Sequence, residues 1–386
     1  MSELTLRWVN SESEIPAELW EACFPAPFEG HWWYQALEHC GIEDQFTFIY
    51  GLVLENERPV AIAPAFLMDV PIRLVVPPAL LPIFNVLGKV MPSALYQRTL
   101  FIGSPCSDEG RVGMVQGVDR LAVLRCVNDA LLAKSKEFKA PMRVWKDFPA
   151  EYDQELTTIA KEAKLFRLVS FPGAEAHIGG SKDAYLASLK SSRRNKLKKK
   201  LKQAANAPVN VEIVQQPSTE VMDELFGLFW QTYEKGTTKF ERLNRKFFDL
   251  ISAHPHAYYV VLRSRENGKV LAFMLCFALG KHVINKFIGI DYSQPKEWFL
   301  YFRLWEAAVE WSASMGAESI QSGQTGYAPK VELGHDMVTL TNYCTHTNPL
   351  VHWIFATVAK TINWDTLDED LAEYVKAYPE LRPKSA

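Results

Sequence analysis

The sequence predicts an α/β protein made of two similarly built halves, each a mixed, mostly antiparallel sheet flanked by helices. Residues 45–70 and 257–282 each contain a β-rich run, a polar Glu-Asn turn and a second β-rich run, a pattern typical of a hairpin. Each hairpin is followed by a segment with helical spacing of apolar residues and then by a short apolar strand. A chain of 386 residues is long enough for two such domains.

The other expected elements follow the same order in both halves. In the first half they are a helix at 31–41 before the hairpin, a helix at 118–138, a strand at 141–145 and a closing strand at 165–171. In the second half they are helices at 218–236 and 244–254, a helix at 297–316, a strand at 318–322 and a closing strand at 337–346. The helix at 297–316 shows the clearest periodicity, through Phe299, Phe302, Trp305, Ala308, Val309 and Ser312.

This order predicts four segments. They are an N-terminal domain at 1–178, a basic junction helix at 179–206, a C-terminal domain at 207–364 and a C-terminal helix and tail at 365–386. The most apolar stretch, 70–92, is interrupted by Arg73, Lys89 and several prolines, so we expect no stable membrane insertion. It is either a buried strand-and-loop segment or a flap over a substrate channel or membrane surface.

Composition indicates a globular protein, with 48% hydrophobic and 23% charged residues. The N-terminus lacks the features of a secretory signal, so a cytoplasmic location is expected. The six cysteines form no C-x-x-C pair, which argues against a disulfide scaffold and against a zinc module. No metal is expected, because the histidines form no recognisable site and the H-P-H at 254–256 is only a weak metal signal.

The charge is unevenly distributed. The chain carries 42 Lys+Arg against 45 Asp+Glu, yet eight positive charges fall within 190–202 without an acid between them. Leucines recur there at near-helical spacing, so one face of a helix can pack while the charges point outward. The helix is a solvated face, a site for a phosphate-rich donor such as coenzyme A or tRNA, or a surface for a nucleic-acid duplex or an anionic membrane. No aromatic residues interleave with the charges, which disfavours DNA but not tRNA.

Three stretches carry a resemblance to a known family: SSRRNKLKKKLKQA at 191–204, KFIGIDYSQPKEWFLYFRLWEAAVEWSASMG at 286–316, and QSGQTGYAPKVELG at 321–334. Together with the order of elements, they resemble the GNAT acyltransferase superfamily, specifically its Fem-like, tandem-GNAT branch, which includes peptidoglycan-bridge transferases. The resemblance extends over roughly residues 4–350. It implies two tandem GNAT-like domains, the second of which holds the acyl donor.

The resemblance implies an N-acyltransferase that joins an acyl group from an acyl-CoA-type thioester to a primary amine. The alternatives are an aminoacyl-tRNA-dependent transferase acting on a peptidoglycan precursor or small metabolite, and a non-catalytic binding scaffold. Members that use coenzyme A place a glycine-rich turn after the central strand, where backbone N–H groups hold the pyrophosphate. Here that junction contains only Gly289, so the identity of the donor stays open, as do the acceptor and the oligomeric state.

The resemblance also implies the site. Lys330 is expected beside the reacting groups, although a surface lysine is the alternative, and Tyr327 is expected to position the amine or donate to an oxyanion, with a structural hydroxyl as the alternative. Asp291 ends the central strand as a base or as an N-cap, and His335 is a further possible base or a solvent-facing turn residue. The residues expected to bind donor or substrate are Ser322, Gly323, Gln324, Tyr292, Arg193, Arg194, Asn195 and Lys196.

Overall fold

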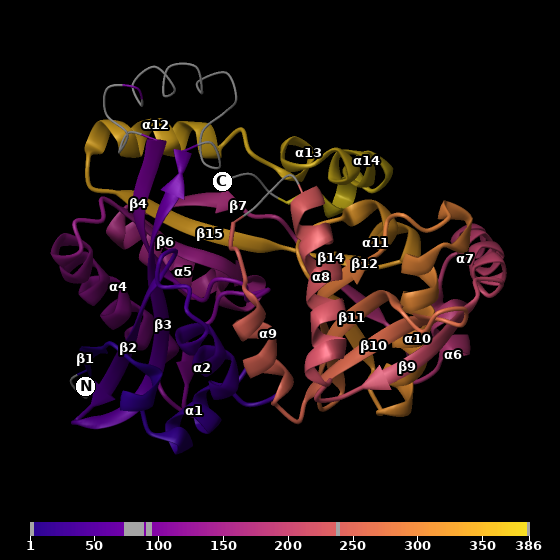
Figure 1. Cartoon of the computed structure of the whole chain (residues 1–386). Helices are drawn as coiled ribbons and strands as arrows, with labels where there is room; N and C mark the ends of the chain where they lie inside the picture. Colours follow the sequence, from indigo (N-terminus) through magenta and orange to yellow (C-terminus); the bar gives the residue numbers. More distant parts are fainter. Residues whose placement is uncertain (1–3, 73–88, 90–94, 237–239, 384–386) are drawn as a thin grey trace.

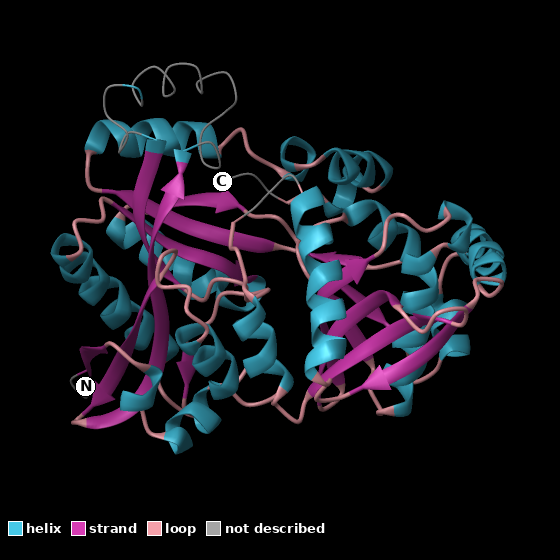
Figure 2. Cartoon of the chain, viewed as in Figure 1, coloured by secondary structure: helices cyan, strands magenta, loops and turns pink. Residues whose placement is uncertain are grey.

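The computed structural model describes residues 4–72, 89, 95–236 and 240–383 of the chain. Two twisted sheets lie side by side, each covered by helices, and the two halves meet along the middle of the molecule (Figure 1). Figure 2 shows how strands and helices alternate in both halves. The apolar stretch 70–92 falls mainly outside the described residues, so both interpretations of it stay open.

The first sheet has the strand order β1-β2-β3-β4-β6-β15-β7, and β5 pairs with β3. Its neighbours are antiparallel except β4 and β6, which are parallel. The strands are β1 (Leu4–Val9), β2 (Thr47–Glu55), β3 (Arg58–Pro71), β4 (Tyr96–Ile102), β5 (Gly113–Met114), β6 (Met142–Pro149), β7 (Phe166–Val169) and β15 (Leu340–His346).

The second sheet has the order β14-β8-β13-β12-β11-β10-β9, and only β12 and β13 are parallel. Its strands are β8 (Gly173–His177), β9 (Val209–Val214), β10 (Ala257–Ser264), β11 (Val270–Leu279), β12 (His282–Ile290), β13 (Ser319–Ser322) and β14 (Asp336–Val338). Both predicted hairpins are present, as β2–β3 and β10–β11. The predicted class, two mixed and mostly antiparallel sheets flanked by helices, is confirmed.

The two sheets exchange strands. The segment 337–346 was expected to close the second half, and this expectation is wrong for β15, which lies between β6 and β7 of the first sheet. In return, β8 leaves the first half and pairs with β13 and β14. Sheet membership therefore does not follow the ranges 1–178 and 207–364, and those domain boundaries stay a prediction.

Helices cover the sheets on both faces. In the second half, every residue of β11 is buried because α8 packs on one face of the sheet and α10 on the other. The helices are α1 (Ala17–Cys23), α2 (His31–His39), α4 (Arg120–Glu137), α5 (Asp153–Ala163), α6 (Lys182–Ser188), α7 (Ser191–Ala204), α8 (Thr219–Lys235), α9 (Arg245–Ser252), α10 (Leu300–Ser314), α11 (Tyr327–Leu333), α12 (Pro349–Ala359), α13 (Trp364–Leu367) and α14 (Glu369–Ala377).

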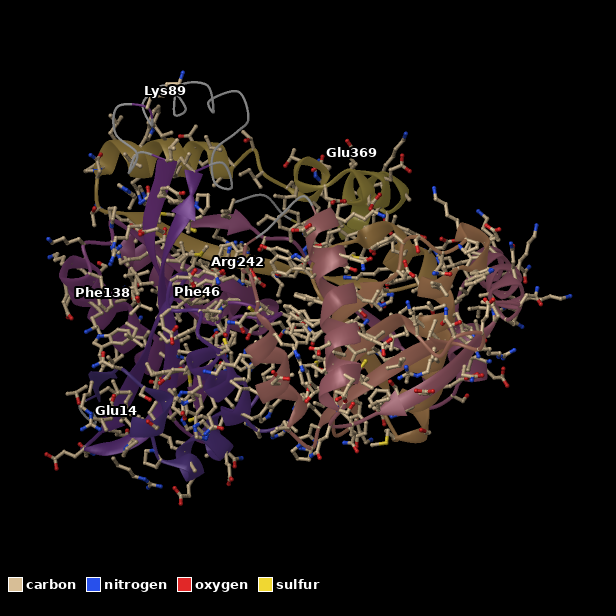
Figure 3. The ribbon with its side chains drawn as sticks, viewed as in Figure 1. Glu14, Phe46, Lys89, Phe138, Arg242 and Glu369 are labelled. Carbon is tan, nitrogen blue, oxygen red and sulfur yellow. The ribbon has the colours of Figure 1, made fainter. Side chains whose placement is uncertain are left out.

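The halves share an apolar core where α2 meets α9. The ring of Trp33 on α2 lies edge-on to Phe247 of α9, with 5.6 Å between ring centroids, and both side chains are fully buried. Arg242, labelled in Figure 3, adds a polar contact, since its guanidinium is 3.2 Å from the carboxylate of Asp44. Burial of several aromatic rings at this junction holds the two sheets in one arrangement.

Candidate functional site between the two sheets

Lys330 lies buried where β13 ends. Its ammonium donates to the backbone carbonyls of Ser322, at 2.8 Å, and of Gly323, at 2.7 Å. The residue is 8% exposed, and burial lowers its pKa from 10.5 to about 7, with the charge of Asp108 acting in the opposite direction. The lysine is therefore not the surface residue that the sequence left as an alternative. It is a desolvated amine that changes protonation state near neutral pH.

His335 packs against Lys330 and is buried as well. Its Nδ1 is 3.0 Å from the carbonyl oxygen of Lys330, so this nitrogen carries the proton, and its Nε2 is 3.2 Å from the hydroxyl of Ser322. Burial, followed by the charge of Lys330, lowers the pKa of His335 to about 3. The ring is thus a neutral support for the β13 end and not the solvent-facing turn residue considered from the sequence.

The first half brings Asp108 to this place on the loop after β4. Asp108 is 3.3 Å from the ammonium of Lys286, which also donates to Glu29 at 2.8 Å. A Cβ atom on Gly323 would lie 3.8 Å from Asp108 Oδ1, so the loop lies directly against the turn that follows β13. Asp108 Oδ2 is buried and has no hydrogen-bond partner. Burial raises the pKa of this carboxyl, and Lys286 opposes the rise.

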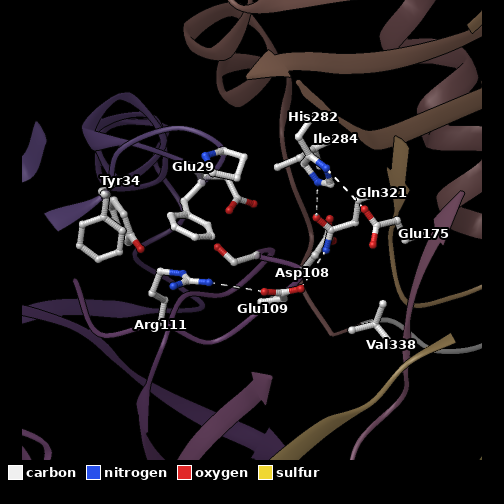
Figure 4. Close-up of a pocket in the computed structure, with 14 residues that line it drawn as sticks. Glu29, Tyr34, Asp108, Glu109, Arg111, Glu175, His282, Ile284, Gln321 and Val338 are labelled. Atoms are coloured by element: carbon white, nitrogen blue, oxygen red, sulfur yellow. Dashed lines mark hydrogen bonds and ion pairs between the residues drawn. The ribbon is translucent and has the colours of Figure 1, made fainter. Parts of the chain in front are cut away.

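Two of these residues, Glu29 and Asp108, line a cavity of about 180 Å³ between the two halves (Figure 4). One wall comes from the loops at 24–29 and 107–111 of the first half, and the other comes from β8, β12 and β13 of the second. The lining residues are Phe24, Pro27, Phe28, Glu29, Tyr34, Ser107, Asp108, Glu109, Arg111, Glu175, His282, Ile284, Gln321 and Val338. A concave site at the junction of two units is a common place for small-molecule chemistry.

A chain of polar contacts crosses this cavity. His282 Nε2 donates to the amide oxygen of Gln321 at 3.2 Å, and the amide nitrogen of Gln321 donates to Glu109 at 3.4 Å (Figure 4). Arg111 then lies 3.7 Å from Glu109, and its guanidinium stacks 3.4 Å above the ring of Phe28. Burial, with Glu29 and Asp108 adding to it against Arg111, raises the pKa of Glu109 to about 7.

Tyr327 does not face the cavity. Its hydroxyl donates to the carbonyl of Pro172 at 2.9 Å and also contacts the carbonyl of Gln324. Its ring is fully buried against the C-terminal helices, beside Trp364 and Leu371. This placement matches the structural role that the sequence left open, because the hydroxyl is already committed to backbone acceptors.

Asp291 and Tyr292 lie at the far end of β12. Although burial acts against it, hydrogen bonds from Ser293 and Gln294 lower the pKa of Asp291. The carboxylate thus caps its own turn and is a weak base, while the N-cap of the helical turn that follows, Lys296–Trp298, is Pro295 and not Asp291. Tyr292 is exposed, and its ring lies 3.6 Å from the ammonium of Lys235.

The remaining predicted residues are divided between the turn and α7. Gln324 donates to the carbonyl of Phe171 at 3.3 Å. Arg193 donates to the hydroxyl of Tyr378 at 3.2 Å, and Arg194 donates to the carbonyl of Ala187 at 3.1 Å, so both arginines tie α7 to its surroundings. Asn195 and Lys196 are exposed on α7. Of the predicted set, the structure brings together Lys330, Ser322 and Gly323.

Sequence reasoning missed the acidic half of the site. Asp108 and Glu109 are two adjacent acids in the loop GSPCSDEGRVG, at 103–113, which follows a strand whose end is buried. Lys286 is an isolated lysine within the apolar strand HVINKFIGI, and its side chain is only 2% exposed. A lone charge inside a buried strand requires a partner, which is the signal that could have identified the pair.

No group of three or more His, Cys, Asp or Glu side chains is arranged to hold a metal ion among the residues that the structure describes. Within that same part of the chain, no helix combines the length and the apolar character needed to cross a bilayer.

Comparisons with known proteins agree with this architecture. Residues 175–362 match the FemAB-like family model, which is described as peptidoglycan biosynthesis/recognition. The fold is similar to the crystal structure of FemX, with a TM-score of 0.59 and 11% identity over 90% of this chain and 100% of that chain. No curated protein matches the sequence.

Two further solved structures share the fold. A tandem GNAT protein from the clavulanic acid biosynthesis pathway has a TM-score of 0.52 and 10% identity over 90% of this chain and 99% of that chain. L-PGS from Bacillus licheniformis has a TM-score of 0.50 and 12% identity over 78% of this chain and 86% of that chain. The FemAB-like match over residues 175–362 and the fold shared with FemX and with the tandem GNAT protein indicate a transferase with a Fem-like, tandem GNAT-like architecture.

Proposed function

We propose that the chain forms an amide bond by transferring an acyl group from an acyl-CoA-type thioester to a primary amine in the cavity between the two sheets. The observation that carries this proposal is Asp108, a carboxylate that lines the cavity, has one unpaired oxygen and interacts electrostatically with the buried Lys330. A proton acceptor and a cationic donor close to each other are what acyl transfer to an amine requires.

The two groups have separate tasks. The acceptor enters as an ammonium ion, and Asp108 Oδ2 takes its proton; burial raises the pKa of Asp108 and so makes it a better base. The neutral nitrogen then attacks the thioester carbonyl. In its ammonium form, Lys330 gives two N–H groups to the carbonyls of Ser322 and Gly323, and we assign the third N–H of this form to the oxyanion. The attached nitrogen still carries two protons: collapse of the intermediate breaks the C–S bond, the leaving thiolate takes one of these protons, and the proton that Asp108 received is released to solvent, so the products are an amide, a thiol and one free proton.

An aminoacyl ester of tRNA is the second candidate donor. A Cβ atom on Gly289 would lie 2.4 Å from the ring of Phe273 and 2.7 Å from the backbone of Phe229, so this glycine permits α8 to pack on β12. The junction after β12 therefore offers no free glycine for a pyrophosphate. Four lysines are exposed along α7 and suit a polyanion: Lys196, Lys198, Lys199 and Lys202.

Turnover with each donor class tests the proposal. The purified chain is incubated with a set of primary amines and either acyl-CoA or aminoacyl-tRNA, and amide formation is followed by mass spectrometry. Amide formation from acyl-CoA that disappears in Asp108→Asn supports the thioester donor. Two results together would select tRNA as the donor. Amide forms from aminoacyl-tRNA alone, and the affinity for tRNA falls steeply as the salt concentration rises. Changing the four α7 lysines to glutamine should make this salt dependence less steep. If neither donor gives product, the non-catalytic scaffold becomes the better description.

A further inference from the structure

The cavity holds more carboxylates than cations. Four acids line it: Glu29, Asp108, Glu109 and Glu175. Lys286 serves two of them, Glu29 at 2.8 Å and Asp108 at 3.3 Å, and is the only ammonium paired with either in the described residues. A buried carboxylate without a matching charge is costly, so an excess of this kind calls for a ligand.

The second pair of acids is equally short of positive charge. Arg111 is shared between two acids: it lies 2.8 Å from Glu151 and farther, at 3.7 Å, from Glu109. Glu175 has His282 as its ionic neighbour, at 3.6 Å. The same ring nitrogen, Nδ1, is closer to the hydroxyl of Ser319, at 2.7 Å, so Glu175 receives no hydrogen bond from this ring.

These two acids lie on either side of Gln321. Glu175 is the backbone partner of Gln321 in the β13–β8 ladder, and Glu109 accepts from the side-chain amide of Gln321 at 3.4 Å. Figure 4 shows Glu109 and Glu175 flanking Gln321 in the cavity, with Asp108 beside them. Asp108 supplies the independent sign of a ligand, because its residue is only 8% exposed and its Oδ2 has no partner.

Size and lining restrict the ligand further. The cavity of about 180 Å³ is smaller than the roughly 300–1,000 Å³ of pockets that take drug-sized molecules. Its apolar lining includes three aromatic residues, Phe24, Phe28 and Tyr34, which can contact a short hydrocarbon chain. Aromatic faces also favour a positively charged nitrogen nearby.

We propose that the acceptor is a small amine with a second positively charged nitrogen, such as a short diamine or the side-chain end of a basic amino acid. Its reacting nitrogen lies at Asp108, its second cation lies between Glu109 and Glu175, and its hydrocarbon spacer contacts the aromatic wall. This inference rests on the proposed function and names the substrate class of the same cavity.

Binding of simple amines to the full chain tests it without any acyl donor. The probes are 1,4-diaminobutane, butylamine and 4-aminobutanoate, titrated by calorimetry at about pH 8, where carboxylates are ionised and alkylamines are still protonated. We expect the diamine to bind about tenfold or more tightly than butylamine, because it gains a charge-assisted contact, and we expect 4-aminobutanoate not to bind.

Variants locate the second cation. Glu109→Gln and Glu175→Gln should each lower the affinity for the diamine by about tenfold while leaving the affinity for butylamine unchanged. The control Glu318→Gln removes an exposed acid paired with Lys281 and should change neither affinity. Melting temperatures establish that the variants fold. If one Gln variant fails to fold, the affinities of the other variant for the diamine and for butylamine still test whether the second cation lies at these acids.

Several outcomes would overturn the inference. The first is equal affinity for butylamine and the diamine. The second is that both Gln variants fold and still bind the diamine more tightly than butylamine by the same factor. The third is that Mg²⁺ or Zn²⁺ raises the melting temperature as much as the diamine does and competes with it. The proposed function fails separately. If the diamine binds selectively through Glu109 but no donor gives an amide, the diamine site stands and the proposed acyl transfer fails. If monoamines are acylated as well as the diamine, acyl transfer stands and the diamine inference fails.

Discussion

Lys286, within β12 of the second sheet, holds Asp108, on a loop of the first sheet, with 3.3 Å between the ammonium and the carboxylate. The ammonium is almost completely buried and also reaches Glu29. Because this ion pair joins residues from the two halves, the site exists only when both halves are folded and in contact.

Replacement of the buried lysine tests its part in turnover. Lys330→Met should lower kcat by about 100-fold, because the oxyanion loses a preorganised donor, while the KM of the amine changes little. The matched control is Lys202→Met, which removes an exposed lysine of α7. Steady-state kinetics on both variants make the comparison, and equal kcat values for Lys330→Met and the unchanged protein would contradict the role given to Lys330.

The protonation of Lys330 should also appear in the stability of the fold. The unfolded chain keeps this proton up to its ordinary pKa of 10.5, whereas the folded chain releases it near 7. Between these values the unfolded state binds more protons, so the lysine makes the free energy of unfolding rise with pH. Denaturant unfolding at a series of pH values from about 6 to 9 should therefore show a smaller rise for Lys330→Met than for the unchanged chain. Parallel curves would mean that the amine titrates outside this window.

Asp108→Asn separates catalysis from folding. The isosteric amide cannot accept the proton of the incoming ammonium, so kcat should fall by about 100-fold or more. Since burial raises the pKa of Asp108, the ionised carboxylate is held at a cost to folding, and the variant should melt at the same or a higher temperature. A lower activity accompanied by a large loss of melting temperature would instead point to a structural role.

Tyr327→Phe should act on stability. The hydroxyl is buried and bonds the carbonyl of Pro172, so its loss leaves a buried acceptor unsatisfied and should cost about 1–3 kcal/mol of unfolding free energy. Activity per folded molecule should stay close to that of the unchanged chain. A fall in kcat without a change in stability would instead support the catalytic role predicted from the sequence, in which Tyr327 positions the amine or donates to the oxyanion.

Gly289→Ala tests whether this glycine serves packing or donor binding. The added methyl group would meet the ring of Phe273 at 2.4 Å and the α8 backbone at 2.7 Å and 2.8 Å, so the variant should lose roughly 1–3 kcal/mol of stability or more. Gly227→Ala, in the same helix and with nothing within 4 Å, should instead gain up to about 1 kcal/mol. If Gly289→Ala stays stable and loses only donor affinity, the glycine belongs to a donor site after all.

The sequence by itself determined the local elements and the region of the buried lysine. Apolar residues at alternating or helical spacing predicted both hairpins and the helix at 297–316, because each element must bury one face or stripe whatever it packs against. The resemblance around 321–334 led to Lys330, since that motif is contiguous in the chain.

Only the tertiary structure decided which elements pair and which side chains meet. The periodicity of β15 fits either sheet, and its partner depends on contacts with β6 and β7 far away in the sequence. In the same way, Tyr327 lies three residues from Lys330, yet its ring packs among the C-terminal helices while Lys330 points to the end of β13. Asp108 reaches the site through a loop of the other half, and no local pattern encodes that meeting, because burial and the pairing of distant charges are properties of the assembled core.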